Sequence, residues 1–133
     1  MKQTLTAYIS TLLAFLILDA VWLGVLMAPT YRAWLGPLML DKPVWGPALI
    51  FYLLYAWGLV AFVVLPALRR HRLGHAASRG VLLGLVAYGT YDLSNWATLQ
   101  GWPAQMAIVD MLWGSFASAV AASVGYWAAR RVL

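Results

Sequence analysis

The sequence predicts an all-α integral membrane protein, an antiparallel bundle of four transmembrane helices with both termini in the cytoplasm. Of its 133 residues, 64% are hydrophobic and only 10% are charged, whereas about a quarter of a soluble domain is charged. Four apolar segments are each close to the ~20 residues that span a bilayer core. The basic residues gather in alternate connections. We expect one transmembrane domain over residues 1–133.

The first segment contains Asp19 and a longer apolar run than a signal peptide has, so we expect it to be retained. Pro66 lies near the inner end of the second segment, where a bend is tolerated. A tight turn, "QGWP", joins the third and fourth segments, which should therefore be antiparallel neighbours. In chain order the segments are residues 4–27, 47–68, 78–98 and 104–129.

The loop between the first two segments, residues 28–46, is longer than the topology requires. It is rich in Pro, Gly and Trp, and its indoles at Trp34 and Trp45 suit a membrane interface. We expect a short interfacial helix at about residues 30–40 that covers one end of the bundle.

The positions of the basic residues predict the orientation. The outer connections hold only Arg32 and Lys42, and by the positive-inside rule this places both termini in the cytoplasm of a multi-pass protein of the bacterial inner membrane. We interpret the Arg-rich connection at residues 69–79 as a topology signal, so no nucleic-acid partner is expected. The remaining basic residues are Lys2, Arg69, Arg70, Arg72, Arg79, Arg130 and Arg131.

Three of the four aspartates, Asp19, Asp92 and Asp110, lie inside the apolar segments, and the chain has no glutamate. An ionisable residue within a membrane is costly and indicates a functional site by default. At a rise of ~1.5 Å per residue, the three carboxyls lie about 9–12 Å below the outer ends of their helices. We therefore expect them to converge in the outer-leaflet half as candidate catalytic residues.

Small residues share helix faces with these acids. Gly84 and Tyr88 precede Asp92 at intervals of four, and Gly114 follows Asp110 by four. Because membrane helices approach one another closely at small residues, the acids should point into the bundle. The Gly80/Gly84 pair is open to two interpretations, packing within the chain or the face of a homodimer.

Aromatic and amide side chains are predicted to complete a polar pocket around the acids. In "DAVWLG" (19–24) and "DMLWG" (110–114), a Trp follows the Asp by three residues, so that an indole should wall each carboxyl. Tyr pairs recur in the second and third segments. The predicted binding residues are Trp22, Tyr52, Tyr55, Tyr88, Asn95, Trp96 and Trp113.

Several of these motifs resemble a family of small bacterial membrane proteins, domain of unknown function 2177. The resemblance implies a four-helix integral membrane protein, and it implies no activity and no catalytic residue. It is carried by "DAVWLG" (19–24), Tyr31 with "LGPL" (35–38), "FYLLY" (51–55), "PAL" (66–68), "YGTYDLSNWATLQGWP" (88–103) and "VDMLWG" (109–114).

Three functions remain open from the sequence. The pocket could bind a small lipid-like molecule from the bilayer and modify it, with a neutral Asp beside an ionised one as an acid/base pair. It could handle protons or a metal ion, since its carboxyl and amide oxygens suit Mg, Ca or Mn. The acids could instead only hold a bundle or a membrane complex together. Without cysteine a zinc–thiolate site is excluded, and we expect no cofactor.

Overall fold

The computed structural model describes residues 1–132, and every regular element in that range is a helix. A π-helical segment, η1 (Trp22–Leu26), extends α1 without a break, and a second one, η3 (Val60–Val64), joins α3 to α4. The remaining element, η2 (Gly36–Leu38), is a short 3₁₀ turn after α2. The helices are α1 (Lys2–Val21), α2 (Ala28–Leu35), α3 (Trp45–Leu59), α4 (Leu65–Arg70), α5 (Leu73–Thr98) and α6 (Ala104–Ala129).

Three continuous helical stretches are long and apolar enough to cross a membrane, Lys2–Leu26, Trp45–Arg70 and Ala104–Ala129. They correspond to the first, second and fourth segments predicted from the sequence, although the first stretch ends at Leu26, one residue before the predicted bound. The predicted third segment lies within α5, which has 26 residues like α6 but is not one of these three stretches. The glycines and polar side chains of α5 make it less apolar.

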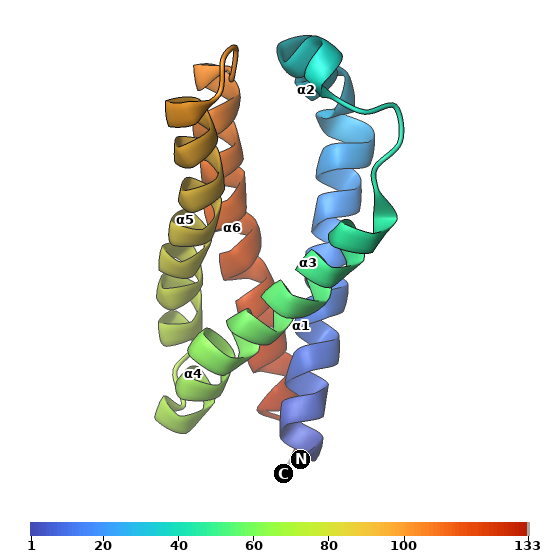
Figure 1. Cartoon of the computed structure of the whole chain (residues 1–133). Coiled ribbons are helices and arrows are strands. Elements are labelled where there is room, and N and C mark those ends of the chain that lie inside the picture. Colours follow the sequence, from blue (N-terminus) through green and yellow to red (C-terminus); the bar gives the residue numbers. More distant parts are fainter. Residues whose placement is uncertain (133) are drawn as a thin grey trace.

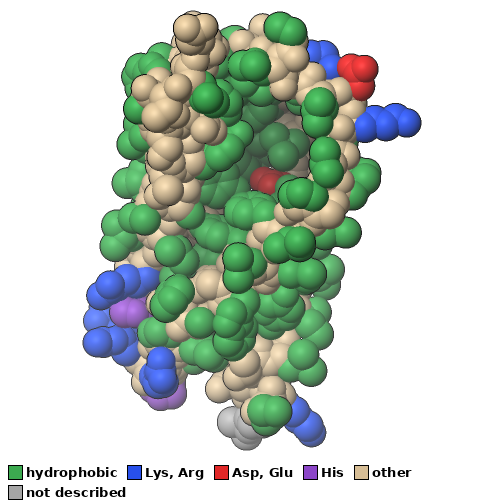
Figure 2. Space-filling view, viewed as in Figure 1, with side chains coloured by type: hydrophobic (Ala, Val, Ile, Leu, Met, Phe, Trp, Pro, Cys, Tyr) green, Lys and Arg blue, Asp and Glu red, His purple; other side chains and the backbone are tan. Residues whose placement is uncertain are grey.

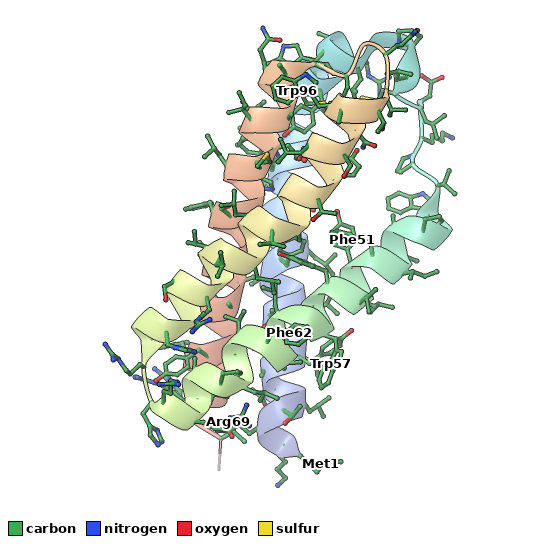
Figure 3. The ribbon with its side chains drawn as sticks, turned by 60° about the vertical axis from the view of Figure 1, so that its left-hand side comes forward. Met1, Phe51, Trp57, Phe62, Arg69 and Trp96 are labelled. Atoms are coloured by element: carbon green, nitrogen blue, oxygen red, sulfur yellow. The ribbon has the colours of Figure 1, made fainter. Side chains whose placement is uncertain are left out.

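The helices form a bundle with both chain termini at one end and α2 at the other (Figure 1). α5 and α6 run side by side in opposite directions, α1 packs along α6, and the α3–α4 stretch crosses obliquely in front. We call the half that contains α2 and the turn at 99–103 the α2 half, and the other the terminal half. Arg69 and Met1 both lie in the terminal half (Figure 3).

Small residues set the close approach of α5 and α6. A Cβ atom added to Gly84 would collide with the backbone oxygen of Gly114, and one added to Gly80 would lie 2.8 Å from the Cα of Ala119. This is the small-residue packing expected between membrane helices. The Gly80/Gly84 pair therefore packs against α6 within the chain, the first of the two interpretations of this pair.

The core is concentrated in the terminal half. Phe15 of α1, Leu59 of α3 and Val60, Val63 and Val64 of η3 are all at most 1% exposed. Large apolar side chains cover the outside of the helices (Figure 2). This surface fits contact with lipid. Lys and Arg side chains gather at the terminal half (Figure 2).

Candidate functional site

A cavity of about 480 Å³ opens in the α2 half, between α1, α3, α5 and α6 and beneath α2. Its volume is in the range of small-molecule sites, about 300–1,000 Å³. Figure 2 shows this face hollowed, with an acidic side chain visible inside the hollow. Aromatic side chains and two carboxyls form most of the lining. The cavity is lined by Asp19, Leu23, Tyr31, Leu35, Phe51, Tyr52, Ala87, Tyr88, Tyr91, Met106, Asp110 and Trp113.

Asp19 links three helices at the base of the cavity. It is 5% exposed, and each of its carboxyl oxygens accepts one hydrogen bond. The Tyr52 hydroxyl of α3 donates to Oδ2 over 2.7 Å, and the Trp113 indole N–H of α6 donates to Oδ1 over 2.9 Å. Two donors on two oxygens are the arrangement that an ionised carboxylate accepts.

Asp110 accepts a hydrogen bond from a residue of α2, Tyr31. The Tyr31 hydroxyl donates to Oδ1 of Asp110 over 3.3 Å, and the same hydroxyl accepts the indole N–H of Trp22 over 3.0 Å. Tyr31 is only 6% exposed, so α2 is anchored by a buried side chain. The helix predicted at about residues 30–40 is thus present as α2 and η2, and Tyr31 fastens it to α6 through Asp110.

The two indoles lie against each other and connect these networks. The rings of Trp22 and Trp113 are stacked, with centroids 4.3 Å apart and planes 3° from parallel. Each indole serves the acid of the opposite helix, because Trp113 bonds Asp19 directly and Trp22 reaches Asp110 through Tyr31. The two Asp-x-x-Trp motifs therefore connect the helices reciprocally. The Trp of each motif is linked to the Asp of the other motif, directly for Trp113 and through Tyr31 for Trp22.

Asp92 is buried and does not line the cavity. It is 0% exposed, and neither of its carboxyl oxygens has a hydrogen-bond partner among residues 1–132. Its carboxyl neighbours that of Asp110. A buried polar group without a partner is rare and calls for an explanation. A single proton held between the two carboxyls would supply one, since adjacent carboxylates do not both ionise readily.

Five of the residues singled out in the sequence line the cavity: Asp19, Tyr52, Tyr88, Asp110 and Trp113. The other predicted site residues, Trp22, Tyr55, Asp92, Asn95 and Trp96, do not.

Two of the residues outside the lining have clear positions elsewhere. The Tyr55 hydroxyl is 2.6 Å from the Ser118 hydroxyl in the buried core. Trp96 is 45% exposed near the end of α5, far from the chain termini (Figure 3). Among the described residues, no hydrogen bond involves the Asn95 side chain, which is half-buried.

Sequence reasoning missed Tyr31, Phe51 and Tyr91, the aromatic residues that complete the lining. Phe51 lines the cavity from α3, whereas Trp57, farther along α3, lies beside Tyr8 of α1, with ring centroids 6.3 Å apart. Tyr91 follows Tyr88 by three residues, a spacing that predicts a shared helix face. Leu23, Leu35, Ala87 and Met106 form the rest of the lining that was not predicted.

No cluster of three or more His, Cys, Asp or Glu side chains that could hold a metal ion occurs within residues 1–132. Asp92 and Asp110 are neighbours, and Asp19 is bound separately by Tyr52 and Trp113. The three acids occupy one region of the bundle without meeting at one point.

Residues 4–127 match the family described as Predicted membrane protein (DUF2177). The chain belongs to this family. In this DUF2177 member, the matched range contains every residue that lines the cavity, together with Trp22 and Asp92. No curated protein and no solved structure matches the chain.

Proposed function

We propose that this DUF2177 protein binds a small lipid-like molecule in the cavity of its α2 half. The observation that carries the proposal is a cavity of about 480 Å³ in an apolar protein, with aromatic walls and carboxyls at its base. Such a combination of apolar lining and a few convergent polar groups is typical of ligand sites. The hollow lies on the side of the bundle, so the ligand would enter from the bilayer (Figure 2).

Acid/base modification of the bound molecule is an extension of this proposal. Asp110 borders the cavity, and the carboxyl of Asp92 neighbours that of Asp110. One proton shared by the pair would give a donor and an acceptor at the same place. The hydroxyls of Tyr88 and Tyr91, both in the lining, form no hydrogen bond with other described residues and are available to a ligand. Asp19, with both oxygens bound, holds the helices in position.

We also propose that α5 is a fourth membrane span, with both termini and the Arg-rich turn between α4 and α5 in the cytoplasm of a bacterial cell. Both termini lie at one end, as an even number of crossings requires (Figure 1). The Lys and Arg side chains of that end favour the cytoplasmic side (Figure 2). α5 buries Asp92 and turns Leu82, Leu85 and Leu93 outwards. The cavity would then face the outer leaflet.

Native mass spectrometry with lipid analysis tests the binding proposal. Ala87 lines the cavity, so Ala87→Leu would fill part of it without changing any charge. Ala97, on the same helix, is exposed, and Ala97→Leu is the matched control. We expect the native protein and the control to retain a specific lipid or metabolite that Ala87→Leu has lost, with equal thermal stability. Folded native protein that retains no such molecule would contradict the proposal.

A further inference from the structure

We propose that the molecule bound in the cavity is a lipophilic organic cation, an ammonium group carried on an apolar body. This inference rests on the proposed binding function and adds the chemical class of the ligand. It comes from three features of the lining: the sign of its charges, the hydrogen bonds already made by its acids, and its aromatic side chains.

The lining contains Asp19 and Asp110 and no Lys, Arg or His. Arg32 is the cation nearest in sequence to the lining residues Tyr31 and Leu35, and it pairs instead with the exposed Asp41 over 3.5 Å. The guanidinium is therefore engaged at the surface. The charged groups that line the cavity are acidic only, which disfavours an anionic ligand.

The hydrogen bonds of Asp19 favour its ionised form. The Tyr52 hydroxyl and the Trp113 indole N–H donate to one oxygen each, and donors to a carboxylate stabilise its negative charge. Buried charges in proteins are normally paired with an opposite charge. Within residues 1–132 no basic side chain forms an ion pair with Asp19 or Asp110. A cationic ligand would balance this charge.

The aromatic side chains provide a second attraction for a cation. Six of the twelve lining residues are aromatic, and they come from α2, α3, α5 and α6. Rings around a cavity attract an ammonium group through their negative faces, most strongly where water is excluded. An aromatic cage with a carboxylate at its base suits a tertiary or quaternary ammonium better than a neutral head group. The aromatic lining residues are Tyr31, Phe51, Tyr52, Tyr88, Tyr91 and Trp113.

The test compares three probes that share one alkyl chain: dodecyltrimethylammonium, dodecanol and dodecyl sulfate, each radiolabelled. The full-length protein is placed in nanodiscs of phosphatidylglycerol, a lipid without an amine that could compete. Asp110→Asn removes a charge from the lining, whereas Asp41→Asn removes one from the exposed surface. The two variants have equal net charge. A difference in probe affinity between them therefore reports binding in the cavity and not attraction of the probe to the bilayer.

We expect the ammonium probe to bind about tenfold more tightly than dodecanol, and to lose about that factor in Asp110→Asn but not in Asp41→Asn. A second variant, Tyr91→Leu, keeps every charge and removes one exposed aromatic wall. It should weaken binding of the ammonium probe and leave dodecanol unchanged. A purely structural role for Tyr91 would not separate the two probes.

The outcomes distinguish this inference from the proposal on which it rests. Equal binding of the three probes, or tighter binding of the sulfate, would overturn the cation and leave the cavity as a lipid site. The cation would also be overturned if the ammonium probe does not bind to a protein that still retains another molecule in mass spectrometry. If no probe binds and nothing is retained, the binding function itself fails.

Discussion

Asp19 and Asp92 show how differently one residue type can be held inside the same bundle. Asp19 accepts a hydrogen bond on each oxygen, from Tyr52 and from Trp113. Asp92 is 0% exposed, has no such donor, and neighbours another acid, Asp110. The first arrangement stabilises a charge, and the second is best completed by a proton. The two carboxyls should therefore respond differently to substitution.

Removing one of the two donors to Asp19 should destabilise the fold. A hydrogen bond to a charged group contributes about 1.5–3 kcal/mol, so we expect Tyr52→Phe to lower the free energy of unfolding by that amount. Tyr126 is 4% exposed and its hydroxyl makes no hydrogen bond with another described side chain, so Tyr126→Phe is the matched control. Equilibrium unfolding in mixed micelles measures both. Equal effects of the two substitutions would rule out a special contribution from the Asp19 network.

The proton inferred between Asp92 and Asp110 should be visible by infrared spectroscopy. A protonated carboxyl has a C=O stretch well separated from that of a carboxylate. We expect this band in the native protein near neutral pH and its loss in Asp92→Asn. The band should persist in Asp110→Asn, because the fully buried Asp92 then keeps the proton. Asp19→Asn should leave it unchanged, because both Asp19 oxygens are occupied by donors. A band that disappears only in Asp19→Asn would show that Asp19, and not the Asp92/Asp110 pair, carries the proton.

At the scale of helices, the contact between α5 and α6 has no room for added atoms. A Cβ atom at Gly84 would collide with the Gly114 backbone, whereas one at Gly58, within α3, meets nothing within 4 Å. We expect Gly84→Ala to destabilise the protein by about 1–3 kcal/mol through overpacking. Gly58→Ala should stabilise it slightly, by up to about 1 kcal/mol, because Ala favours a helix. Thermal unfolding of both variants measures the two changes in stability, and equal changes would contradict close packing at Gly84.

The long helices could be predicted because their apolar runs extend over many residues. The helix over 104–129 has the bounds expected from the sequence. α5 begins at Leu73, five residues before the apolar segment at 78, because "LGHAAS" is helical without being strongly apolar. The π-helical η3 ends just before α4, whose second residue is Pro66. Pro lacks the N–H that a regular helix needs, which accounts for an irregular turn there.

The site was only partly predictable, because its parts come from different helices. The three acids could be singled out since ionisable residues are rare in such segments. That Tyr31 reaches Asp110, and that Trp113 bonds the acid of α1, depends on the rotation of the helices and on the path of the 28–46 loop. Tyr55 shares a helix with Tyr52, yet its hydroxyl meets Ser118 in the core. The spacing of residues along one helix does not determine which partner on another helix each side chain meets.

For the molecule as a whole, the decisive question is whether α5 crosses the membrane. The chain has no cysteine, so single thiols can be introduced. Gln100 and Gly74 are exposed at opposite ends of α5. We expect an impermeant maleimide to label Gln100→Cys in intact cells and Gly74→Cys only after permeabilisation. Labelling of both in intact cells would mean that α5 does not cross, and the reverse pattern would mean the opposite orientation.

The position of the cavity in the α2 half would give binding of the proposed cation an electrical component. Asp110 lies six residues after the start of α6 at Ala104, about 9 Å along the helix and so roughly a third of the way across a ~30 Å core. Moving one elementary charge across 100 mV is worth ~2.3 kcal/mol. A cation that descends to Asp110 from outside would therefore gain roughly 0.8 kcal/mol, about a fourfold change in Kd. Its occupancy would rise when the cell is energised and fall when the membrane potential collapses.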